Sequence, residues 1–156
     1  MEPFEIKDLI VVKGKPGLWI PVRYIPSAKM VNVKNLVDEY DTFTTKLTNV
    51  EFIKNYNIFL NHGEMSLENV FGFIMDMEEK ELVKMEELDS YDSLDVVDKF
   101  KMMNRLVPDY DPNRFKSYHL SKIIKWYKAL SKGLSILNAG IVDPYSDPLG
   151  ETKTSE

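Results

Sequence analysis

The chain has 156 residues, of which 44% are hydrophobic and 12% aromatic, enough to build a core in one ordinary domain or in two small ones. It contains no cysteine, which excludes a disulfide scaffold, a thiolate zinc site and a cysteine nucleophile, and which fits a reducing cytoplasm. The N-terminus does not read as a signal peptide, and no apolar run approaches the roughly 20 residues that span a bilayer, so we expect a soluble cytoplasmic protein that contacts no membrane.

The net charge of −5 is unevenly distributed along the chain. Residues 1–63 carry +1, residues 64–98 carry −10, residues 99–138 carry +7 and the last 18 residues carry −3. Three interpretations stay open for the acidic middle and the basic part that follows it: they attract each other within the fold, they meet different partners, or they are solvated helix faces.

The first sixty residues have the composition of short β-strands. These segments are rich in β-branched and aromatic residues, and turn residues separate them. The expected strands are 9–12, 18–25, 29–36, 41–47 and, as a fifth, 57–61. Five short strands in this length predict an α+β protein that begins with a small SH3-like β-barrel over residues 1–63.

A glycine-flanked lysine, Gly14-Lys15-Pro16-Gly17, separates the first two strands. A type II turn over residues 15–18 suits this segment, because proline sets the second position and glycine accepts the positive φ of the third. A phosphate-binding loop would need a helix after the second glycine, whereas Leu18 opens another strand. The segment therefore predicts a structural turn.

After residue 63 the pattern becomes helical. Ser66 is expected to cap a helix with one apolar stripe, formed by Leu67, Val70, Phe71, Ile74 and Met77. Residues 78–92 are acidic and weakly periodic, which predicts an exposed helix end or a mobile linker. A second helix is expected over about 93–106, with Leu94, Val97 and residues 102–106 as apolar contacts, and Pro108 ends it.

The last predicted helix begins near Ser117 and ends at Gly133, which has the position of a C-terminal capping glycine. Its apolar stripe is Leu120, Ile123, Ile124, Tyr127 and Leu130. Its opposite side carries Lys122, Lys125, Lys128 and Lys132, with Tyr118 among them. The helical domain is expected over residues 64–137, and residues 138–156 have the turn-forming and polar composition of a flexible tail.

No catalytic constellation is visible. There are two histidines, His62 in a turn and His119 near a helix start, and a buried or capping role is expected for His119. Asp109 and Asp111 have the spacing of ordinary turn residues that bond to local backbone. We therefore expect a non-enzymatic protein with no cofactor and no metal ion.

The residues with a binding pattern are cations and aromatics near the two ends of the chain. Basic side chains can meet phosphates while an aromatic ring stacks on a base. The candidate nucleic-acid or partner-binding residues are Lys13, Lys15, Trp19, Arg114, Lys116, Tyr118, Lys122 and Lys125.

Two functions stay open for these residues, beside a merely solvated lysine face. One is a binding module for RNA or DNA, including a ribosome-associated protein, that uses the basic helix and the barrel rim around Lys13 and Lys15. The other is a protein–protein adaptor that uses exposed aromatics such as Trp19 and the acidic helical region. The oligomeric state is left open.

Two segments, "VKGKPGLW" and "LVPDYDPNRFKSYHLSKIIKWYKAL", resemble the two hallmark segments of an uncharacterised bacterial family, a domain of unknown function. The matching residues are Gly14 to Leu18, Pro108 to Asp111, Arg114, Ser121 to Ile123, and Trp126-Tyr127. The resemblance covers both ends of the chain, whereas residues 26–100 depart from the pattern of the family. It implies an SH3-like N-terminal domain followed by a helical domain, and it brings no activity, ligand or catalytic residue.

Overall fold

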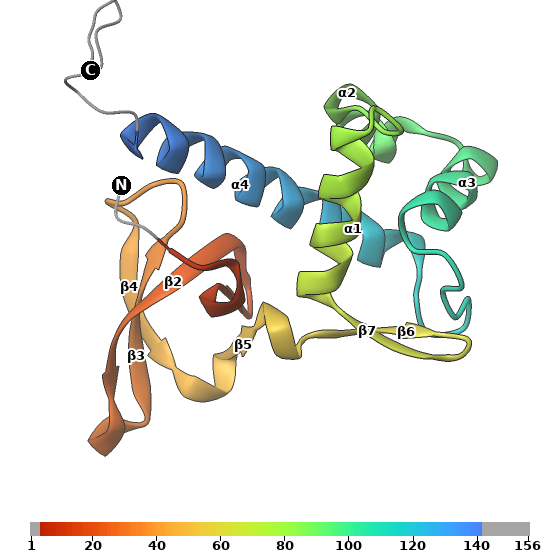
Figure 1. Cartoon of the computed structure of the whole chain (residues 1–156). Coiled ribbons are helices and arrows are strands. Elements are labelled where there is room, and N and C mark those ends of the chain that lie inside the picture. The colour runs from red at the N-terminus through yellow and green to blue at the C-terminus, as the bar shows by residue number, and fades with distance from the viewer. Residues whose placement is uncertain (1–3, 142–156) are drawn as a thin grey trace, which may run out of the picture.

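A computed structural model describes residues 4–141, and the side chains as far as residue 137. The chain is an α+β protein with its strands first and its main helices after them, as predicted (Figure 1). The strands are β1 Ile10–Val12, β2 Lys15–Ile25, β3 Met30–Asn35, β4 Thr42–Lys46, β5 Val50–Phe52, β6 Asn57–Leu60 and β7 Gly63–Ser66. The helices are α1 Leu67–Glu79, α2 Met85–Asp89, α3 Val96–Leu106 and α4 Ser117–Ile141.

The first five strands form one antiparallel sheet in the order β4-β3-β2-β1-β5. The long strand β2 pairs with β1 at its start and with β3 along the rest of its length, and its register shifts between Pro21 and Arg23. Within the described residues, no pairing joins the two edge strands β4 and β5. The N-terminal antiparallel sheet is thus confirmed, and it is open rather than closed into the predicted barrel.

The fifth strand of this sheet differs from the predicted one. Residues 57–60 do form strand β6, but β6 pairs with β7 in a separate two-stranded hairpin. The sheet is completed instead by β5, where Phe52 lies opposite Ile10 of β1. A strand of three residues is too short to show an alternating pattern, which explains why the sequence did not predict it.

Both faces of the sheet are buried around β1 and the first part of β2. One face gathers Ile10, Val12, Trp19, Val31 and Val33 into a core of its own. The other face contributes Leu9, Val11, Leu18 and Leu36 to a larger core that it shares with the helices. Strand β1 therefore consists of three buried residues in succession and does not alternate between apolar and polar positions.

The predicted stripes of the first and last helices are confirmed. The backbone N–H of Asn69 donates to Ser66 Oγ over 3.2 Å, so Ser66 caps α1 as expected. All five stripe residues of α1 are buried, and so are the five of α4. Helix α4 runs across the molecule from the other helices to the sheet (Figure 1). Its apolar stripe belongs to the core that the sheet and the helices share.

The acidic stretch between the first two predicted helices is ordered, contrary to the alternative of a mobile linker. It contains α2 and a 3-10 turn at Tyr91–Ser93, and it buries Val83, Leu88 and Tyr91. Helix α2 has five residues, too few to show a helical period. In α3, Val97 is 61% exposed, so its predicted apolar contact is wrong.

Helix α4 does not end at Gly133. It continues to Ile141, which places residues 138–141 of the predicted tail in the helix, and the rest of that tail lies outside the described residues. Gly133 faces Leu36 so closely that an added Cβ would lie 2.7 Å from Leu36 Cγ. This glycine therefore allows helix and sheet to approach each other, which its sequence position does not distinguish from a cap.

Among the residues that the structure describes, no helix combines the length and the apolar character that a membrane-spanning segment needs.

Candidate functional site

A cleft of about 560 Å³ lies where the β1–β2 hairpin faces the first half of α4. Its lining residues from the hairpin include Lys13, Lys15, Pro16 and Gly17, and those from the segment before and within β5 include Thr48 to Glu51. Helix α4 adds Lys122, Lys125 and Trp126, and Tyr56 lies between these walls. The fold thus brings lysines from the two ends of the chain to one concave site.

Local backbone geometry shapes the hairpin wall of this cleft. Val12 pairs with Lys15, so the tight turn has Lys13-Gly14 at its centre, three residues earlier than the predicted Pro16-Gly17. Pro16 and Gly17 lie inside β2, where the register shifts because β2 has two more residues than β1 between paired positions. The expected positive φ of Gly17 is confirmed at +90°, and Gly14 has +79°. The segment continues into a strand, as predicted, so no helix begins directly after it.

The cleft is cationic. Its lining holds four lysines and one acidic residue, Glu51, which amounts to a formal charge of +3. Lys13 and Lys122 are exposed and form no ion pair with the described part of the chain. Lys15 Nζ lies 5.1 Å from the centre of the Phe43 ring, and Lys125 Nζ lies 3.8 Å from Asp92 Oδ2. Two of the four ammonium groups therefore need no internal partner displaced before they meet an anion.

An aromatic pair forms part of the cleft wall. The rings of Tyr56 and Trp126 meet edge to face, with their centres 5.5 Å apart. Partial burial raises the pKa of the Tyr56 hydroxyl, and the negative charge of Glu51 raises it further. Tyr56 is thus neutral at physiological pH, and the wall offers apolar ring surface beside the lysines.

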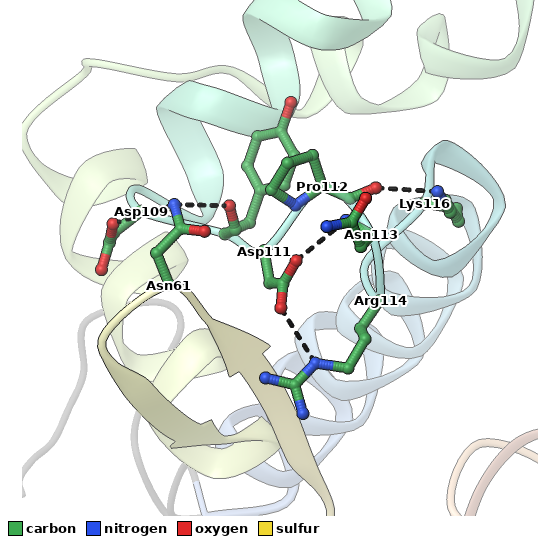
Figure 2. Close-up of polar contacts among 8 residues, drawn as sticks. Asn61, Asp109, Asp111, Pro112, Asn113, Arg114 and Lys116 are labelled. Carbon is green, nitrogen blue, oxygen red and sulfur yellow. Dashed lines mark hydrogen bonds and ion pairs between the residues drawn. The ribbon is translucent and has the colours of Figure 1, made fainter.

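Arg114 and Lys116 do not line this cleft and are held by local contacts. Arg114 Nε donates to Asp111 Oδ2 over 2.9 Å, and its guanidinium lies 4.3 Å from the centre of the Phe59 ring. Lys116 Nζ donates to the carbonyl oxygen of Pro112 over 2.8 Å (Figure 2). Both cations stabilise the segment that leads from α3 into α4.

The same segment anchors the β6–β7 hairpin. The Asn61 side-chain amide donates to Asp109 Oδ1 over 3.2 Å and to the Tyr110 carbonyl over 3.3 Å (Figure 2). The Asn113 N–H and then Arg114 hold the pKa of Asp111 below its usual value, and His62 does the same for Asp109. The interpretation of Asp111 as a turn residue that bonds to local backbone is confirmed, since its Oδ1 accepts the Asn113 N–H. The Asp109 carboxylate instead bonds to the side chains of Asn61 and His62 in the distant hairpin, so the local role predicted for it is wrong.

Two predicted aromatic residues lie elsewhere. Tyr118 is 60% exposed, and its ring packs 4.2 Å from that of His119, outside the cleft lining. Trp19 is only 2% exposed and packs edge to face on Phe43, so its predicted role as an exposed aromatic is wrong. The reason is that the sheet is buried on both faces at Leu18 and Trp19 of β2, which the sequence of one strand does not reveal.

His119 has the expected capping role. Its Nδ1 accepts the backbone N–H of Lys116 over 2.8 Å. Partial burial lowers the pKa of His119, and the positive charges of Lys122 and Lys116 lower it further, so the ring is neutral at pH 7 and can accept this bond. The described residues hold no group of three His, Asp or Glu side chains suited to a metal ion.

Sequence reasoning missed Tyr56 and Glu51 as members of the site. Tyr56 stands alone between two short strands, so no pattern singled it out. Trp126 was visible at the edge of the α4 stripe, and its position beside Lys122 and Lys125 was the available signal.

The acidic segment around α2 docks against the basic helix. Ser121 Oγ donates to Asp92 Oδ1 over 2.7 Å, and Lys125 lies near the other oxygen of that carboxylate. One turn further along α4, Lys128 pairs with Asp89. Of the three interpretations of the uneven charge, attraction within the fold is observed for these residues.

The family model described as Domain of unknown function (DUF6852) matches residues 56–130 of the chain. This match supports the expected resemblance to a family of unknown function. No curated protein matches the chain. A solution NMR structure of a protein from Bacteroides vulgatus has a TM-score of 0.60 and 18% sequence identity, and the match covers 97% of this chain and 99% of that one. At this identity the likeness shows a shared fold and nothing about activity.

Proposed function

We propose that this protein is a non-enzymatic binding module that takes up RNA or DNA in the cleft between the β1–β2 hairpin and α4. The observation that carries the proposal is the convergence of Lys13, Lys15, Lys122 and Lys125 on one concave site with a single acidic residue in its lining. Nucleic-acid affinity comes largely from such cations, because phosphate contacts release counterions.

The proposal includes the SH3-like character of the N-terminal part. The strand order β4-β3-β2-β1-β5, the long β2 and the 3-10 turn Leu47–Asn49 just before β5 support it, although the sheet is open. Small barrels of this kind offer loops and strand edges to ligands, and here the loop between β1 and β2 forms one wall of the cleft. A bacterial cytoplasmic setting, with a ribosomal RNA as one possible target, belongs to the same proposal.

The overall charge opposes this function at long range. A protein with a net charge of −5 repels phosphates at distances where individual side chains are not resolved. Salt, however, screens charges that lie more than about 8 to 10 Å away. A phosphate close to the cleft therefore responds mainly to the local charge of +3. We therefore expect binding that is moderate in strength and strongly dependent on salt.

A second function is favoured by a different surface. Val96, Val97 and Phe100 are all exposed on the first half of α3, beside acidic side chains. An adaptor that binds another protein through this apolar and acidic face would leave the cleft without a role.

The decisive test is charge reversal in the cleft. The double variant K122E/K125E should lower the affinity for a labelled oligonucleotide about tenfold or more, and the slope of log affinity against log salt should become shallower by roughly 0.7 to 0.9 for each lost contact. Both lysines are exposed on the polar side of α4, and the Lys125–Asp92 contact that is lost joins exposed side chains and is worth at most about 1 kcal/mol. The fold should therefore persist, which circular dichroism checks.

The matched control is K29E/K132E. Both lysines are exposed, neither lines the cleft, and the change in net charge is identical. The control should retain most of the affinity. Wild-type protein that binds no RNA or DNA at low salt would remove this proposal and leave the adaptor, and an equal loss in both double variants would show that the cleft is not the site.

A further inference from the structure

We infer that the cleft selects single-stranded nucleic acid over a duplex, because it holds an unpaired base against Trp126 while the surrounding lysines bind the flanking phosphates. This inference rests on the proposed function and names the form of nucleic acid that the site accepts.

The lysines are arranged around a hollow rather than on a protruding surface. A volume of about 560 Å³ lies within the roughly 300 to 1,000 Å³ of sites that enclose small molecules. Duplex DNA is read by elements that protrude into its grooves, and its bases stay stacked inside. A recessed cationic site therefore fits a flexible single strand, because the nucleotides of such a strand enter the site one at a time.

The chemistry of the lining also suits an exposed base. Beside its lysines the cleft presents apolar surface from the half-buried side chains of Val50, Tyr56 and Trp126. A base has two apolar faces that a single strand exposes and a duplex hides. Stacking on aromatic side chains beside a basic groove is the usual way in which proteins bind single strands without reading their sequence.

The Trp126 ring is positioned in the cleft wall for stacking on a base. It is half-buried, and the edge-to-face contact with Tyr56 fixes the orientation of its ring. A smaller cavity of about 130 Å³ adjoins the cleft, since Tyr56, Lys122 and Trp126 line both. Arg114 and His119 line that second cavity. The two hollows thus share Trp126 in their linings, and each also holds lysine or arginine side chains, which fits a strand of more than one nucleotide.

Tryptophan fluorescence of the full chain tests the inference. The protein has two tryptophans, and Trp19 is buried in the separate core of the sheet, so a ligand in the cleft should quench Trp126. A ten-nucleotide single strand should quench the emission and bind about tenfold or more tightly than a duplex of the same sequence. Equal affinity for the duplex would overturn the inference while leaving the proposed function in place.

Two variants separate stacking from charge. Trp126→Leu should lower single-strand affinity about tenfold without changing its salt dependence, whereas Lys122→Glu should lower both. Trp126→Phe keeps an aromatic face and should retain most of the affinity, which distinguishes stacking from a loss of fold. Unchanged affinity in Trp126→Leu, or a Trp126→Phe variant that folds like the wild type yet binds as weakly as Trp126→Leu, would overturn the inference. If neither strand form binds the wild type, the proposed function itself fails.

Discussion

Gly17 combines a φ of +90° with a close neighbour. A Cβ at this position would lie 3.3 Å from the side-chain nitrogen of Asn35. The oxygen of the same Asn35 amide accepts the backbone N–H groups of Val37 and Asp38, so this side chain cannot easily move aside. Gly17 is therefore required both by its backbone conformation and by its surroundings.

We predict that Gly17→Ala lowers the free energy of unfolding by about 1 kcal/mol or more, since alanine resists positive φ. Gly14→Ala is the matched comparison, because Gly14 also has a positive φ, of +79°, while nothing lies within 4 Å of its added Cβ. Urea denaturation of both variants should show the larger loss for Gly17→Ala. A Gly17→Ala variant as stable as the wild type would contradict this explanation.

At the scale of elements, the contact between α4 and the sheet depends on one small residue. Gly133 lies within α4, where glycine costs up to about 1 kcal/mol relative to alanine in helix propensity. The buried side chain of Leu36 occupies the space that a methyl group would need, with Cγ and Cδ2 at 2.7 and 2.8 Å from an added Cβ. Tertiary packing therefore opposes local propensity here, and overpacking of this kind typically costs about 1 to 3 kcal/mol.

We predict that Gly133→Ala is destabilising although alanine is the better helix former. Gly72→Ala in α1 is the control, because its added Cβ meets nothing within 4 Å, and this variant should gain stability of up to about 1 kcal/mol. The pair Gly133→Ala with Leu36→Ala should show a favourable coupling in a double-mutant cycle measured by urea denaturation. Stabilisation by Gly133→Ala alone would mean that α4 does not approach the sheet this closely.

At the scale of the whole molecule, the uneven charge of the sequence brings an acidic side chain close to a lysine of the cleft. The acidic segment around α2 reaches the basic face of α4, where Asp92 lies near Lys125 and Asp89 pairs with Lys128. Lys125 lines the cleft and Lys128 does not. Asp92 therefore competes with any anion for a cleft lysine, while Asp89 engages a cation outside the site.

We predict that Asp92→Asn strengthens oligonucleotide binding about two- to fivefold at low salt, the range expected for releasing one exposed ion pair. Asparagine keeps an oxygen that can accept the Ser121 hydroxyl, so the segment should stay docked. Asp89→Asn makes the same change in net charge and should leave the affinity within error of the wild type. A binding titration that shows equal gains in both variants would indicate a long-range charge effect in place of local competition.

The sequence by itself determined what depends on neighbouring residues. The cap at Ser66 and the apolar stripes of α1 and α4 follow from local backbone geometry or from helical period. The stripe of α4 also showed that Lys122 and Lys125 lie on its polar side. These features were predictable because each is decided within a few turns of chain.

Tertiary structure alone decided the rest. The pairing of β5, the burial of Trp19 and the passage of α4 beyond Gly133 depend on segments far away in the sequence. The same holds for the cleft, in which Lys13 and Lys122 are brought together across more than one hundred residues. A polar stripe shows which side of a helix avoids the core, but only the packing of α4 on the sheet determines what that side faces, because the free energy of burial depends on area and not on chain order.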